Sequence, residues 1–166
     1  FILVISWFKA WRELNLVGFI FTFIVGVFWG ANNYRPELFA TVEPFVLIFF
    51  AMYLVIPILF ARRQPPELNG LVDGTLVFGT PVSTAFMQAA LVRDIPNGLA
   101  WSTTGAALLY AVLAVMVIRR EGMRLLGETY IALATIFATM AIFFAFDAYP
   151  TFALWTLEGA AIVWVG

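Results

Sequence analysis

Apolar and polar positions alternate along this chain in long blocks. Apolar stretches of roughly 16 to 25 residues, about the length that a helix needs to cross a bilayer, are separated by short polar segments. These segments contain Pro, Gly or several charges, which end helices; they are NNYRPE (32–37), RRQPPE (62–67), RDIPNG (93–98), RREGMR (119–124) and DAYP (147–150). The pattern predicts membrane-spanning helices near residues 14–31, 38–61, 68–92, 99–118, 125–146 and 151–166.

The predicted fold class is an all-α, polytopic transmembrane helix bundle of about six spans. Strands of a membrane barrel would be about ten residues long and alternating in polarity. Residues 1–13 pass from an apolar run to Lys9, Trp11 and Arg12, which favours the tail of a preceding span or an interfacial helix over a seventh span. Because the chain starts at Phe1 and stops inside an apolar run, we expect residues 1–166 to be a single transmembrane domain, an internal fragment of a longer polytopic protein.

Composition agrees with a membrane environment. The chain is 63% hydrophobic and 11% charged, whereas soluble domains are about 45–50% apolar and about 25% charged. It has no Cys and no His, so thiolate nucleophiles, the usual general base and the commonest metal ligands are missing. We therefore expect no catalytic residues, no metal and no cofactor. There is no basic stripe, and hence no expected nucleic-acid partner.

The basic residues predict an orientation, because cytoplasmic loops collect Lys and Arg. Only Arg35 and Arg93 fall on one side, and the other seven basic residues fall on the opposite side. Residues 1–13, 62–67 and 119–124 are thus predicted to be cytoplasmic, and residues 32–37, 93–98 and 147–150 periplasmic or external. The expected location is a membrane that the chain crosses several times.

Small residues recur at helical spacing in three predicted spans, where they let helix backbones approach closely. The positions are Gly26 and Gly30, then Ala107, Ala111 and Ala114, then Ala134, Ala138, Ala141 and Ala145. They predict packing against other helices of the same longer chain or within a homo- or hetero-oligomer, besides the lipid bilayer.

Four carboxylates lie inside the predicted spans, and ionisable groups there are candidate functional sites. They are Glu43, Asp73, Glu128 and Glu158. All four come early in their own span, where the helix dipole and unpaired N–H groups favour anions. On this structural interpretation Glu43 caps a helix that begins at Pro44, and Glu128 pairs with Arg124 one turn before it.

Asp73 has two interpretations. It suits an N-cap for a helix that runs from Gly74 onward. The same stretch contains Gly79 and Pro81, and helices broken at such residues build ion and substrate sites in transporters. A helix break at Gly74, Gly79 and Pro81 beside an acid is therefore the functional alternative to a capped, kinked helix.

Glu158 fits the dipole explanation least well. If Thr151 caps the last helix, Glu158 lies about 10 Å along the axis, too deep for a cap. No Lys or Arg is near it in the sequence. We predict that Glu158 is protonated and hydrogen-bonded between helices, with a functional role and a structural role equally supported.

Five phrases together resemble a known family: LNLVGFIFTFIVGVFWG, FATVEPFVLIFF, LVDGTLVFGTP, LLGETYIALA and ALWTLEGAAIVWVG. In this order they are similar to the bacterial membrane proteins grouped as domain of unknown function 2339, over nearly the whole chain. The resemblance implies a long polytopic protein of the inner membrane. It carries no established catalytic residues to this chain.

The sequence leaves three functions to compare. A structural or assembly component of the cell envelope fits the small-residue stripes, with the carboxylates as hydrogen-bond anchors. A proton- or solute-coupled transporter that uses the intramembrane carboxylates is the alternative, supported by the threonines Thr75, Thr80, Thr84, Thr103 and Thr104. An enzyme is disfavoured, since only carboxylates and Arg could serve it.

Overall fold

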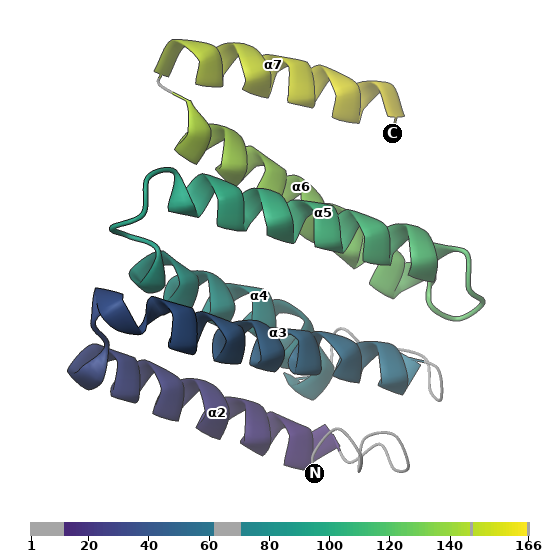
Figure 1. Cartoon of the computed structure of the whole chain (residues 1–166). Helices are drawn as coiled ribbons and strands as arrows, with labels where there is room; N and C mark the ends of the chain where they lie inside the picture. The colour runs from purple at the N-terminus through teal and green to yellow at the C-terminus, as the bar shows by residue number, and fades with distance from the viewer. Residues whose placement is uncertain (1–11, 62–70, 147, 166) are drawn as a thin grey trace. The chain divides into compact units, whose positions relative to one another are not determined.

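The computed structural model describes residues 12–61, 71–146 and 148–165 (Figure 1). In this part of the chain every regular element is helical, which confirms the all-α prediction. The elements are α2 (Arg12–Asn33), the 3₁₀ turn η1 (Pro36–Leu38), α3 (Phe39–Ala61), α4 (Leu71–Leu91), α5 (Gly98–Ile118), α6 (Arg124–Ala145) and α7 (Ala148–Val165). The prediction for residues 1–13 falls almost wholly outside the described residues.

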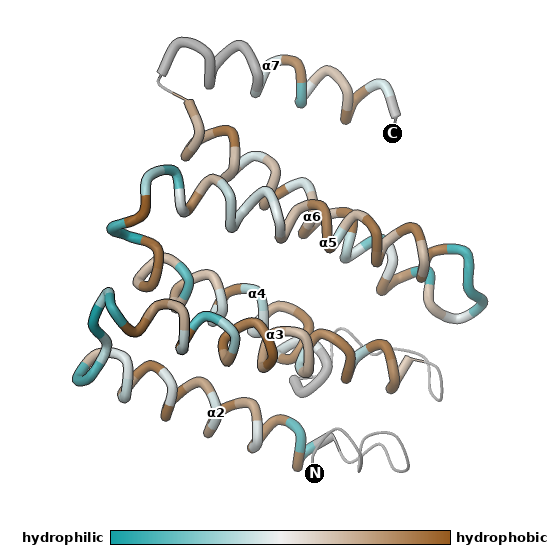
Figure 2. The backbone as a smooth tube through the Cα atoms, viewed as in Figure 1, coloured by the Kyte–Doolittle hydropathy of each residue, from teal (hydrophilic) through white to brown (hydrophobic). Residues whose placement is uncertain are grey.

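Four described segments are long and apolar enough to cross a bilayer. They are Glu13–Asn33, Pro36–Ala61, Gly98–Ile118 and Arg124–Ala145, with mean hydropathies between 1.6 and 2.5. The helix α4 is not among them, because Thr, Ser, Gly and Gln residues interrupt its apolar sequence, and neither is α7, which contains Glu158. Polar residues gather in the described turns that follow α2, α4 and α5 (Figure 2). The described helices therefore fit a helical membrane bundle.

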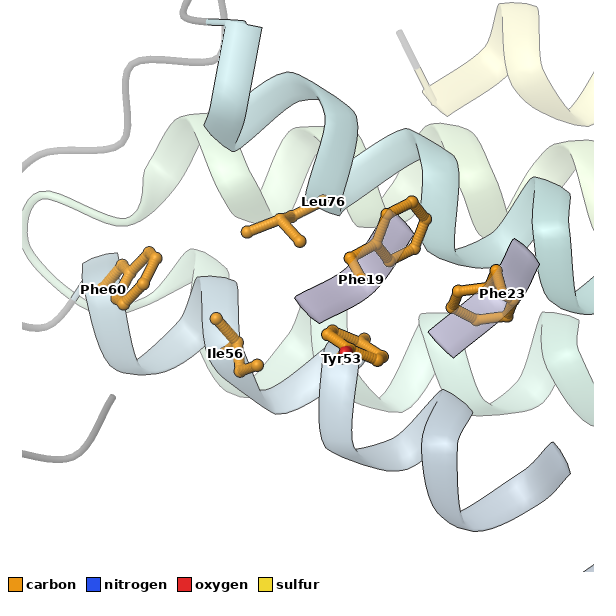
Figure 3. Packing of buried hydrophobic residues seen from close by; sticks show 6 residues of the cluster. All are labelled: Phe19, Phe23, Tyr53, Ile56, Phe60 and Leu76. Carbon is orange, nitrogen blue, oxygen red and sulfur yellow. The ribbon is translucent and has the colours of Figure 1, made fainter. Parts of the chain in front are cut away.

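The chain forms two compact units, residues 1–91 and residues 92–166, and each is described by itself. In the first unit α4 packs against both α3 and α2. A hydrophobic cluster from the three helices fills its interior (Figure 3); its members are Phe19, Phe23, Tyr53, Ile56, Phe60 and Leu76. The Tyr53 ring meets Phe19 edge-on at 5.3 Å, and its hydroxyl lies 2.9 Å from that of Thr22.

At Gly74, Gly79 and Pro81, where the sequence suggests a helix break, the structure describes α4 as one helix from Leu71 to Leu91 with Pro81 inside it. A Cβ on Gly79 would lie 3.0 Å from the Phe19 ring, so this glycine serves the close approach of α2. Helix–helix packing of this kind tolerates Pro inside a membrane helix, since neighbouring helices hold the turn in place.

The predicted helix starts also need correction. Because α3 begins at Phe39, directly after η1, Glu43 lies in its second turn and does not cap a helix that begins at Pro44. Because α4 begins at Leu71, Asp73 lies in its first turn and is not the N-cap. Because α7 begins at Ala148, Glu158 lies about 15 Å along the helix axis, deeper than predicted.

In the second unit α5 and α6 form a tightly packed hairpin, and α7 contacts α6. The Tyr110 ring is fully buried between the helices, stacked on Phe137 at 5.7 Å and tilted against Tyr130 at 5.6 Å. At the hairpin turn Gly122 takes a φ of +75°, a conformation that glycine adopts without strain. The small-residue stripes contribute Ala114 and Ala141 to the buried residues of this unit.

Candidate functional site

The carboxylate of Glu43 is held by a side chain from the neighbouring helix. The Gln88 amide donates a 2.7 Å hydrogen bond from Nε2 to Oε1 of Glu43. Glu43 lies near the start of α3 and Gln88 near the end of α4. The hydrogen bond therefore ties the two helices together at one end of the first unit.

The same region contains buried polar atoms that have no hydrogen-bond partner among the described residues, namely Oε2 of Glu43 and Oγ1 of Thr84. Thr84 is only 8% exposed and stands one turn before Gln88, so both project from the same face of α4. Buried polar atoms without partners are uncommon. They give this cluster the capacity for one more polar contact.

The carboxyl group of Glu158 lies against a threonine of α6. The Thr139 hydroxyl oxygen is 2.9 Å from both Oε1 and Oε2 of Glu158. It is also 3.0 Å from the carbonyl oxygen of Thr135 on its own helix. The Trp155 indole donates a weaker bond of 3.4 Å to the Thr139 carbonyl. The predicted interhelical hydrogen bond of Glu158 is thus present.

The Thr139 hydroxyl cannot donate to every acceptor around it. The Thr139 hydroxyl has one proton but three oxygen atoms within reach. If Glu158 is protonated, it donates to Thr139, and Thr139 donates to the Thr135 carbonyl, so each proton is used. If Glu158 is ionised, Thr139 satisfies only one of its oxygens.

The infrared spectrum of the folded chain at neutral pH tests the protonated state that the sequence predicts for Glu158. If Glu158 is protonated, the difference spectrum between the unmodified chain and Glu158→Gln is expected to show loss of a protonated carboxyl C=O band. Glu128→Gln provides the control and is expected to remove a carboxylate band. Loss of a carboxylate band on replacing Glu158 would contradict the protonated state.

The other two carboxylates behave differently. Glu128 accepts a 2.8 Å bond from Nε of Arg124, as predicted, but its side chain is half exposed. Exposed pairs of this kind contribute about 0–1 kcal/mol, so Glu128 is best explained as a local ion pair. The side chain of Asp73 lies outside the described residues.

The carboxylates of the second unit do not meet. Thr139, the partner of Glu158, is about 16 Å along the axis of α6 from Glu128. Glu43 belongs to the first unit and has its own partner there. Glu43, Glu128 and Glu158 therefore each have a separate local partner.

Most of the threonine hydroxyls predicted to support a polar path donate within their own helices. Thr80 donates to the Leu76 carbonyl at 2.7 Å, and Thr103 and Thr104 donate to Leu99 and Ala100, also at 2.7 Å. These bonds satisfy the hydroxyl proton inside the helix, so a polar partner or water is not required. Of the five threonines, Thr84 is the one whose hydroxyl is buried without a described partner.

Gln88 and Thr139, the partners of Glu43 and Glu158, were not predicted from the sequence. The prediction rested on ionisable groups, yet a neutral amide inside an apolar helix is also costly to bury without a partner. Gln88 could have been singled out on that ground. Among the described residues no group of three or more Asp, Glu, His or Cys side chains is placed to hold a metal.

The apolar helices, polar turns and internally paired carboxylates define a multi-pass α-helical membrane protein. The family model described as "Predicted membrane protein (DUF2339)" matches residues 1–166, and the chain belongs to this family. This confirms the family resemblance. The comparison with curated proteins and the comparison with solved structures found no match.

Proposed function

We propose that this protein is a structural or assembly component of the cell envelope, embedded in the bacterial inner membrane. The observation that carries the proposal is the separate local pairing of the candidate carboxylates, with Glu43 bound by Gln88, Glu128 by Arg124 and Glu158 by Thr139. Side chains paired in this way act as anchors between helices. The chain is proposed to have no enzymatic activity of its own, and other helices of a longer chain or an oligomer are its proposed partners.

The proposed orientation follows the basic residues. The turn 119–124, which contains Arg119, Arg120 and Arg124, would face the cytoplasm, and the turns 32–37 and 93–98 would face outward.

A second candidate function is proton-coupled transport. It is favoured by Oε2 of Glu43 and Oγ1 of Thr84, which are buried and have no partner among the described residues. A carboxylate with one free buried oxygen is a chemically suitable place for a transferable proton. The two functions differ in what they predict for Glu43→Gln and Glu158→Gln. A transporter would lose proton flux, whereas a scaffold would keep its stability and assembly.

The distinguishing variants are Glu158→Gln and Glu158→Leu in the full chain. The Gln side chain still bonds Thr139 and is expected to keep the stability and the assembly of the protein. The Leu side chain loses the bond, with an expected loss of about 0.6–2 kcal/mol. Stability is measured by titration with denaturing detergent, and assembly by crosslinking in the native membrane.

Transport is tested on the same variants in vesicles that contain a pH-sensitive dye. The scaffold proposal expects that an imposed pH gradient decays at the rate of empty vesicles, with or without Glu43→Gln and Glu158→Gln. Proton flux through the unmodified chain that either amide variant abolishes, without loss of stability, would overturn the scaffold proposal in favour of transport.

A further inference from the structure

An apolar groove of about 310 Å³ lies on the first unit, between α2, α3 and α4. This is within the usual range for small-ligand sites, about 300–1,000 Å³. Its walls include Phe45 and Phe49 of α3 and Met87 of α4. At its edge Gly30 leaves open space, because a Cβ there would meet no atom within 4 Å. The groove therefore has room for a flexible hydrocarbon chain.

A polar hollow adjoins this groove. It is formed by the turn between α2 and α3 and is lined by Asn32, Asn33, Arg35 and Glu37. Tyr34 lines both the hollow and the groove. Its hydroxyl donates a 3.0 Å bond to the Leu91 carbonyl at the end of α4, which fixes the ring between the two regions.

The charges of the hollow complement a zwitterion. Arg35 forms no ion pair with a described residue, and its guanidinium group suits a phosphate. The carboxylate of Glu37, two residues later, suits an ammonium group. The amide nitrogens of Asn32 and Asn33 donate to carbonyls of their own helix at 2.7 and 3.1 Å, which leaves their side-chain oxygens as acceptors.

The apolar groove, its aromatic residues and the polar hollow follow one another in the same order as hydrocarbon, interface and water in a membrane. Trp29, half exposed, and Tyr34 line the groove at its polar end, and such side chains prefer the boundary between hydrocarbon and water. The acyl chains and head group of a phospholipid meet at the same boundary. The apolar groove, the aromatic side chains Trp29 and Tyr34 and the charged hollow thus follow the order of acyl chain, glycerol region and head group in a phospholipid.

We propose that the first unit binds one phosphatidylethanolamine-type lipid. One acyl chain lies in the groove beside Gly30, the phosphate binds Arg35 and the primary ammonium binds Glu37. A purely anionic head group would place no cation on Glu37, and a choline head group has no N–H to donate to it.

The test uses the full chain in bilayer discs with a photoactivatable phosphatidylethanolamine that carries its reactive group in the acyl chain. Labelling is expected on the α3 segment around Phe45 and Phe49. Gly30→Leu fills the groove and is expected to reduce this labelling about tenfold, the effect of two lost methylene contacts. Gly105→Leu is the matched control, since Gly105 also has no atom within 4 Å of a built Cβ and lies on α5, outside the groove.

Head-group recognition is tested separately by competition with unlabelled lipids. The unmodified chain is expected to prefer phosphatidylethanolamine over phosphatidylcholine about fivefold, and Glu37→Gln to remove most of this preference. Equal competition by the two lipids, labelling unchanged by Gly30→Leu, or a groove occupied by another protein segment would each overturn the proposal.

Discussion

Replacing Gly127 with Ala is expected to destabilise the α5–α6 hairpin by about 1–3 kcal/mol. A Cβ at this position would lie 2.8 Å from Cα and Cβ of Ile118 and 3.0 Å from its backbone nitrogen. Backbone atoms cannot rotate away as the end of a flexible side chain does, so the two helices must separate. The measurement is the loss of helical circular dichroism during titration with a denaturing detergent.

Gly105→Ala is the control for this prediction. It lies on α5, and its Cβ would meet no atom within 4 Å, so the change tests helix propensity alone. It is expected to leave stability unchanged or raise it by up to about 1 kcal/mol. Equal stability of Gly127→Ala and the unmodified chain would show that α5 and α6 do not approach this closely in the bilayer.

Gln88→Leu is expected to destabilise the first unit by about 1–3 kcal/mol, because it leaves both oxygens of Glu43 without a described partner. Adding Glu43→Leu is expected to recover most of this loss, since replacing both members of a buried pair with apolar side chains is often nearly neutral. The double variant should thus be more stable than Gln88→Leu alone. Stability is measured by the same detergent titration.

The result of this double-mutant cycle distinguishes a pair from two independent side chains. Additive losses from Gln88→Leu and Glu43→Leu would mean that the hydrogen bond between them contributes nothing. Ser83→Ala is the matched control, because Ser83 lies on the same helix as Gln88 and is only partly buried. Its replacement is expected to change the stability by no more than about 0.5 kcal/mol.

The sequence predicted the described helices well, because lipid leaves few ways to satisfy a polar backbone. Their starts were predicted less well. Pro44 and Pro81 lie inside α3 and α4, where a soluble-protein rule would end the helix. The local pattern could not show that packing from neighbouring helices would hold both turns.

Side-chain partners within one helix could be predicted from the sequence, and partners between helices could not. The Arg124–Glu128 pair was predictable because both residues belong to one helix and their spacing fixes their distance. Gln88 and Thr139 were not, because their contacts with Glu43 and Glu158 depend on the rotation of two helices. Helical periodicity defines faces but does not say which faces meet.

The pairing of Glu43 with Gln88 has a consequence for the biogenesis of the protein. The helix α4 is too polar to be among the segments suited to crossing a bilayer by composition alone, whereas α3 is strongly apolar. Gln88 finds a carboxylate partner only when α3 is beside it. Because α3 is synthesised before α4, Glu43 is already in the chain when Gln88 is made. We expect α4 to enter the membrane together with α3, as a helical hairpin in which the Gln88 amide bonds Glu43.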